Sequence, residues 1–275
     1  MKTPGSFDEF LEALDAKYRS GDQQTEEYAV RLAANVQQKK SLLGYRDKID
    51  RRELLAQQAD GLARLQALCR SCGVSFQESA DVEHENYLYN GEHLRIETLV
   101  RTLTFTASGE QQAALLRESC RQSQKSGLQT LRQLAGEWYG RMASSAAAAE
   151  LADDVSRALL SEILEKKRSH PALLSLDWNL HVEDTRVLVS GSGNAAFENY
   201  FNRRGIEPLR GVQQYCAAAA VVTEKLCGTL AAEPCVLAAR VSAGKEADGR
   251  DAWASLRIYY AVDDANRRKP LRSWT

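Results

Sequence analysis

The class of fold is decided by the stretch Tyr87-Leu88-Tyr89-Asn90-Gly91-Glu92 and by the segment that follows it, Leu94–Thr106. Asn-Gly between two apolar runs is typical of the two-residue turn of a β-hairpin, because both residues tolerate positive φ. The following segment is rich in β-branched residues, with an apolar period near two in places. We therefore expect a β-hairpin at about residues 86–106.

The residues before the hairpin have the apolar spacing of helices. A capping box at residues 6–9 predicts a short first helix that ends near Gly21. Tyr28, Leu32 and Val36 recur at helical spacing and predict a second helix, which begins near residue 25 and ends near residue 43. A third helix is predicted over residues 47–72.

After the hairpin, helical spacing returns from residue 110 to about 167, as one long helix or as two helices broken between Gly136 and Ser145. The basic stretch Lys166–Pro171 is the best domain boundary, because a basic helix end followed by proline is how helices stop. The pattern beyond it predicts strands at 175–182 and 186–190, helices at 195–203 and 209–230, and strands at 235–241 and 253–262.

These elements predict an α+β fold. An N-terminal arm with a short helix (residues 1–24) precedes a long-helix module that contains the β-hairpin (residues 25–168). A smaller α/β sandwich module follows (residues 171–275).

Charge and composition narrow the class of partner. The 36 Lys and Arg residues nearly balance the 37 Asp and Glu residues, so no overall field attracts nucleic acid or an acidic membrane. The one local basic excess, which could contact phosphate weakly, consists of Arg267, Arg268, Lys269 and Arg272.

Compartment is indicated by what the sequence lacks. The first residues have no apolar signal-peptide core. The longest apolar run, Cys216–Val222, is far shorter than the about 20 residues that span a bilayer. Six cysteines without secretory context are interpreted as reduced thiols, so we expect a cytoplasmic or nuclear protein.

One face of the predicted helix at 47–72 is an apolar seam that requires a packing partner. The seam consists of Leu55, Leu62, Leu65 and Cys69, with Gln58 as its polar exception. Another helix of the same chain is the favoured partner, and a coiled coil with a second chain is the alternative. Cys69 and Cys72 have C-x-x-C spacing, which suits half a zinc site or a redox pair. Because no second pair completes a metal site, we expect these thiols to pack as small hydrophobes.

The most suggestive ligand-binding motif is the turn Gly191-Ser192-Gly193-Asn194. With Ala196 it satisfies G-x-G-x-x-A between a predicted strand and helix, where main-chain amides can contact a phosphate. A clean second strand ending in an acid about 20 residues later is missing, which favours a simple turn. His84 and His93 lie near glutamates at the hairpin turn, but a solvated loop is the favoured interpretation. We expect no metal and no cofactor.

No G-x-S-x-G, P-loop lysine or H-E-x-x-H motif is present, so an enzyme is the less favoured class. The pattern favours a protein-protein interaction or scaffold subunit of an intracellular complex. Such a subunit would present amphipathic helical faces to a protein partner or to a second copy of the chain. The alternative is an enzyme or ligand-binding protein with a phosphate or nucleotide site at residues 191–194. A third class, an RNA-contacting accessory protein, would use the basic residues near the C-terminus.

Overall fold

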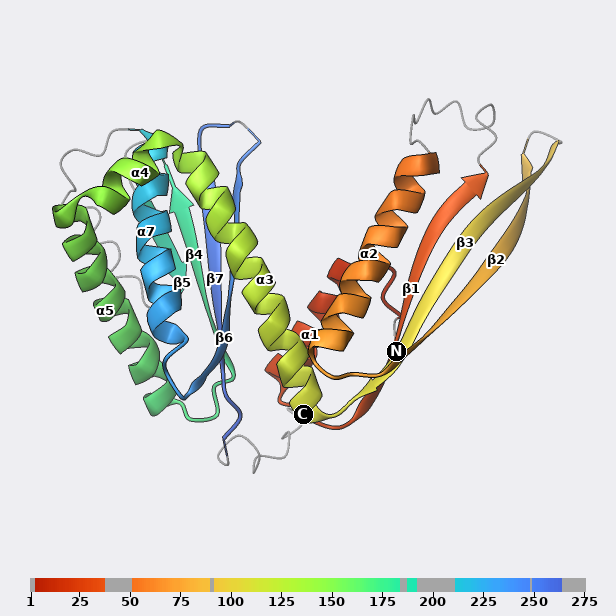
Figure 1. Ribbon diagram of the computed structural model, residues 1–275, viewed down its shortest axis with the longest axis horizontal. Helices are drawn as coiled ribbons and strands as arrows, with labels where there is room; N and C mark the ends of the chain where they lie inside the picture. The colour runs from red at the N-terminus through yellow and green to blue at the C-terminus, as the bar shows by residue number, and fades with distance from the viewer. Residues whose placement is uncertain are drawn as a thin grey trace. The chain divides into compact units, whose positions relative to one another are not determined.

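The computed structural model describes residues 3–37, 51–89, 92–183, 187–191, 211–247 and 249–263. The fold is α+β, as the sequence predicts, and the chain divides into two compact units, residues 1–118 and 119–275 (Figure 1). The boundary expected after residue 168 differs from this division, because it falls between two elements of the second unit. No helix in the described part of the chain is long and apolar enough to cross a membrane.

Unit 1 contains helices α1 (Phe7–Ser20) and α2 (Arg51–Ser71) and strands β1 (Glu26–Gln37), β2 (Phe76–Tyr89) and β3 (Glu92–Ala107). The strands form an antiparallel sheet in the order β1-β3-β2. Helix α2 lies along β1 (Figure 1). The pairing of Tyr89 with Glu92 confirms the predicted hairpin, whose strands are longer than expected.

Helix α1 begins and ends where the sequence predicts. The Ser6 hydroxyl accepts a hydrogen bond from the Glu9 amide at 3.1 Å, and the Glu9 carboxylate accepts from the Gly5 amide at 2.8 Å. Gly21 ends the helix in the left-handed conformation, with φ of 79°. The Phe10 ring meets Tyr28 and Phe105 edge-on, with centroids 5.7 Å apart in both cases, and so fixes α1 to the sheet.

The predicted helix over residues 25–43 is wrong where the structure describes it, because residues 26–37 form strand β1. The buried residues of β1 are Tyr28, Val30, Leu32 and Ala34. They alternate with exposed Arg31 and Ala33. Residues four apart lie on one face of either a helix or a strand, so the spacing of Tyr28 and Leu32 did not separate the two.

Helix α2 is fixed to the sheet by Gln58, the polar residue of its apolar face. The side chain is buried, and its amide nitrogen donates to the carbonyl of Leu32 at 2.8 Å and to that of Leu99 at 2.9 Å. These carbonyls belong to β1 and β3, so one side chain ties the helix to two adjacent strands. A buried amide is tolerated here because its donors are satisfied.

Helix α3 (Gly109–Ala135) contributes its first residues to unit 1 and the others to unit 2. Unit 2 also contains α4 (Glu137–Ser144), α5 (Ala146–Ser169) and α7 (Val212–Leu230). Its strands are β4 (Ser175–Val182), β5 (Val187–Gly191), β6 (Val236–Lys245) and β7 (Ala252–Tyr260), in the antiparallel order β5-β4-β7-β6. The helices pack on one face of this sheet around a core that includes Trp178, Leu226 and Ile258.

The segment 110–167, predicted as one or two helices, forms three. The breaks are at Gly136 and Ser145, the two ends of the range where a break was predicted. Gly136 has φ of 56° and separates α3 from α4. Ser145 caps α5, its hydroxyl accepting from the Ala148 amide at 3.5 Å. The strand and helix predictions at 175–190 and 209–262 agree with the structure to within a few residues, whereas the helix expected at 195–203 lies outside the described residues.

The C-terminal part of α3 covers the outer edge of β6. The Ser123 hydroxyl donates to the Val241 carbonyl at 2.7 Å, and the Gln124 side chain donates to the Ala239 carbonyl at 2.8 Å. The close approach depends on Gly127, since a Cβ atom there would lie 2.5 Å from the Val241 carbonyl oxygen. A glycine inside a helix usually destabilises it. The close approach of α3 to β6 explains why a glycine occupies position 127.

Gly127→Ala should therefore destabilise unit 2 by about 1–3 kcal/mol, because the added methyl group forces α3 away from β6. Gly140→Ala is the matched control: Gly140 is an exposed helical glycine with open space around it, and the change should stabilise by about 0.4–1 kcal/mol. Urea denaturation of both variants measures the difference. Equal stabilisation by the two changes would contradict the proposed contact.

Candidate functional site

Strand β2 forms one edge of the sheet of unit 1, because β3 lies between it and β1 (Figure 1). All side chains from Gln77 to Asn86 are exposed, although the Gln66 side chain of α2 donates to the Glu78 carboxylate at 2.8 Å. Val82 and Leu88 are 46% and 69% exposed, which is high for large apolar residues. Long edge strands of this kind are usually shortened, bulged or covered, since their main-chain groups can pair with another chain.

The main-chain groups of β2 point alternately towards β3 and away from it. The Val82 amide donates to the carboxylate of its neighbour Asp81 at 2.8 Å, so it points away from the ladder with β3. The register with β3 is uninterrupted from Phe76 to Tyr89. Glu78 and Ala80, four and two residues before Val82, therefore direct their main-chain groups to the same outer edge.

The two faces of β2 differ in chemistry. Asp81, Glu83 and Glu85 lie on the face that carries exposed Ala33, opposite to the face covered by α2 on β1. The other face carries Ala80 and Val82. Residues 76–86 contain four acidic residues and no Lys or Arg. The edge is therefore an acidic strand with a short apolar patch on its other face.

Two arginines, one from the adjacent strand β3 and one from β1 beyond it, form ion pairs with acids of β2. Arg31 of β1 forms an ion pair with Glu83, in which each side chain is 44% exposed. Arg101 of β3 lies 3.7 Å from Glu78. Ion pairs this exposed contribute little to stability, because water and salt screen them. Their carboxylates can exchange partners at small cost.

The outer edges of β1 and β6 have hydrogen-bond partners from other parts of the chain. On β1, the outward-facing Arg31 amide donates to the carbonyl of Pro4 at 2.9 Å, so the N-terminal segment pairs with this edge. On β6, side chains of α3 bind the outer carbonyls, as described above. Strand β5 adjoins residues outside those described. Within the described residues, β2 is the long edge strand to which neither a segment nor a helix is bonded along its outer side.

Most of the residues predicted to bind phosphate lie outside the described part of the chain. Gly191 is the last residue of β5, while Ser192, Gly193 and Asn194 lie outside the described residues. The basic residues Arg267, Arg268, Lys269 and Arg272 also lie outside them.

The apolar seam of α2 is covered from within unit 1. Leu62, Leu65 and Cys69 are buried, and Leu55 is half-buried. The contacts of α2 are most extensive with β1 and include the helix α1 of the same chain, so most of the seam packs on the sheet. The burial is explained by the strand nature of residues 26–37, which the sequence interpretation missed.

The Cys69 and Cys72 pair has the properties of packing residues. Burial, together with the neighbouring Cys72 thiol, raises the pKa of Cys69 to about 12, and burial also raises the pKa of Cys72. Thiols with raised pKa values are poor nucleophiles and poor metal ligands at neutral pH. Among the described residues, no group of three or more His, Cys, Asp or Glu side chains could hold a metal ion.

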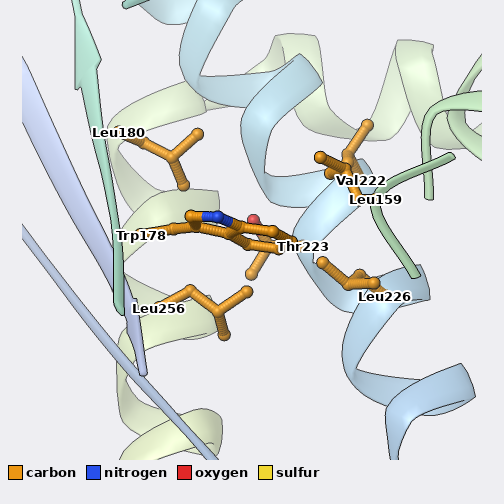
Figure 2. A pocket seen from close by; sticks show the side chains of 7 residues that line it. All are labelled: Leu159, Trp178, Leu180, Val222, Thr223, Leu226 and Leu256. Carbon is orange, nitrogen blue, oxygen red and sulfur yellow. The ribbon is translucent and has the colours of Figure 1, made fainter. Parts of the chain in front are cut away.

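A small apolar cavity lies in the core of unit 2, between β4, β7 and α7 (Figure 2). Figure 2 shows the Trp178 ring extending from β4 towards α7, with Leu180 and Leu256 on either side. The cavity has a volume of about 10 Å³, which is about the space of one water molecule. This void is a packing imperfection and has no room for an organic ligand.

A polar cluster joins three helices of unit 2. Glu224 of α7 accepts hydrogen bonds from Arg132 of α3 and from the Tyr139 hydroxyl of α4. Burial alone would raise the pKa of Glu224, but the bonds from Arg132 and Tyr139 outweigh it and hold the pKa below its ordinary value. The cluster is an interhelical clamp, because the Glu224 carboxylate joins α7 to both α3 and α4.

The chain matches no protein-family model, no curated protein and no solved structure. Function must therefore be inferred from the exposed surfaces of the described residues, and the outer edge of β2 is one of them. The sequence interpretation found the hairpin but missed this edge. The signal was present in residues 76–86, where acids recur every second residue from Asp81 to Glu85 and no Lys or Arg intervenes.

The Glu224 clamp gives a pH prediction. Because its pKa is lowered in the folded state, its contribution is present at neutral pH and is lost as the pH falls below the ordinary glutamate pKa of about 4.3. Glu224→Gln should cost about 0.5–1 kcal/mol at pH 7, as expected for a half-exposed ion pair, and nothing at about pH 3. Urea unfolding at both pH values tests this, with exposed Glu150→Gln on α5 as the control. A cost that is the same at both pH values would contradict the account.

Proposed function

We propose that this chain is a protein-binding module, or a scaffold subunit, that holds a segment of a partner protein along the outer edge of β2 by strand addition. The observation that carries the proposal is the Val82 amide, which points away from β3 and donates to a side chain of its own strand. In strand addition, main-chain hydrogen bonds supply affinity and alternating side chains supply specificity.

The rigidity of the sheet behind β2 supports this function. Strand β3 pairs with β2 and with β1 along most of its length, and Gln58 ties α2 to both β1 and β3. The edge is thus formed before any partner arrives, so binding does not have to order it.

The surface proposed here differs from the helical faces favoured by the sequence. The apolar residues Leu62, Leu65 and Cys69 of α2 are buried inside unit 1 and cannot present themselves to a partner without unfolding. The β2 edge is exposed without any rearrangement.

Ala80→Pro tests the proposal, because proline removes an outward-facing amide and leaves the ladder with β3 intact. Ala33→Pro is the matched control, since Ala33 is exposed and lies two residues beyond the outward-facing Arg31 on the opposite edge strand. Proteins captured from a native lysate by the full chain should be reduced about tenfold or more by Ala80→Pro and kept by Ala33→Pro. Quantitative mass spectrometry of the captured proteins measures this.

Circular dichroism should show that both proline variants keep the fold. Capture that survives Ala80→Pro unchanged would contradict the use of this edge. Capture of no protein by the wild-type chain would contradict the proposed function itself.

A further inference from the structure

The chemistry of β2 identifies the kind of segment that its edge fits. We propose that the bound segment is an extended basic strand of a partner protein, with Lys or Arg at alternate positions facing Asp81, Glu83 and Glu85. The residues that face Val82 and Ala80, one between these basic positions and one just beyond them, are small or β-branched and apolar. This inference rests on the proposed function and specifies its partner.

The acidic face sets the positions of the basic residues. Asp81, Glu83 and Glu85 lie on one face at every second position, so their spacing along the strand is about 6.6–6.8 Å. An added strand has the same period, and its alternate side chains fall directly opposite these three carboxylates. Cross-strand pairs of opposite charge stabilise a sheet, whereas like charges directly opposite destabilise it.

The interactions that these carboxylates already make do not block the segment. Glu83 is bonded to Arg31, but both side chains are 44% exposed, and pairs at this exposure are weak. A basic residue of the added strand can share or replace Arg31 at Glu83. Asp81 binds the Val82 amide of its own strand, and an incoming carbonyl takes over that amide when the strand pairs.

The opposite face sets the positions of the apolar residues. Val82, which is 46% exposed, pairs with half-buried Leu99 on β3, and exposed Ala80 lies next to it on the same face. An apolar side chain opposite Val82 removes this exposed surface from water. Small side chains are favoured beside Ala80, because Arg101 and Glu78 flank it.

A second copy of this chain fits poorly in the two registers centred on the acidic residues, for the same reason. If two β2 strands pair antiparallel about Glu83, Asp81 meets Glu85 of the other copy and Glu83 meets its own equivalent. If they pair about Val82, Asp81 of each copy lies directly opposite Glu83 of the other copy. Both arrangements place carboxylates directly opposite carboxylates, which is unfavourable.

Two synthetic peptides of identical composition test the pattern against simple charge attraction. Fluorescence anisotropy with the full wild-type chain is measured for Thr-Lys-Thr-Lys-Val-Lys-Val-Thr, which alternates, and for Thr-Lys-Lys-Lys-Val-Val-Thr-Thr, which does not. The alternating peptide should bind at least about tenfold more tightly, since only it places three lysines on one face of a strand.

Charge-reversal variants locate the site. In the combined variant Asp81→Lys, Glu83→Lys, Glu85→Lys, binding of the alternating peptide should fall about tenfold or more, because three attractive pairs become repulsive. The control variant Glu12→Lys, Glu53→Lys, Asp60→Lys changes the net charge by the same amount at exposed positions elsewhere in unit 1, and should bind normally. Sedimentation of the wild-type chain should show a monomer.

Equal binding of the two peptides, or binding of neither, would overturn the inference, and so would a dimer dissociated by the lysine variant. If neither peptide binds, the acids of β2 serve only to keep the edge from aggregating. These failures are distinguishable from failure of the proposed function. If native partners are lost with Ala80→Pro while the peptides are not discriminated, the edge is used but the partner has a different sequence pattern.

Discussion

The main-chain hydrogen-bonding groups at sheet edges are the constraint on which the rest of this structure depends. Each such group must find a partner or remain in water, because an unpaired buried group costs as much as a lost hydrogen bond. On β1 the carbonyl of Pro4 meets the Arg31 amide. On β6 the side chains of Ser123 and Gln124 meet two outer carbonyls. Strand β2 leaves its outer groups to solvent or to its own Asp81.

In both units, glutamine side chains on helices donate hydrogen bonds to main-chain carbonyls of strands or of the residues next to them. Gln58 reaches carbonyls of β1 and β3, and Gln112 reaches the carbonyl of Gln24 at 2.9 Å and that of Ala107 at 3.2 Å. Gln124 does this on β6. In each case a helix is joined to main-chain groups of a strand or of its flanking residues, which fixes its position more specifically than apolar packing alone.

Much of the fold could be predicted from local signals. The Asn90-Gly91 pair identified the hairpin, Ser6 and Gly21 identified the ends of α1, and the pattern after Pro171 identified the strands of unit 2. Strand β1 was missed because Tyr28 and Leu32 fit a helical period as well as a strand period. The burial of Val30 and Ala34 on the same face shows that the segment is a strand. That burial depends on tertiary packing, so the sequence alone does not reveal it.

The candidate site was less predictable for a physical reason. Whether a strand is central or at an edge depends on which strands pair, and pairing between β1 and β3 joins residues 60 or more apart in the sequence. The acids of residues 78–85 are visible in the sequence, but only the strand order β1-β3-β2 makes them the border of a sheet. Nor does the sequence reveal that Pro4 and α3 cover other edges.

The most direct test of this account is amide hydrogen exchange along β2 in the free full-length chain, measured residue by residue by NMR. The account predicts alternation: the outward-facing amides of Glu78 and Ala80 exchange rapidly, whereas the amides of Ser79 and Asp81, which bond to β3, are protected. Protection of both sets would contradict it, because another part of the chain or a second copy would then already occupy the edge. Rapid exchange of both sets would also contradict it, because β2 would then not be a preformed strand.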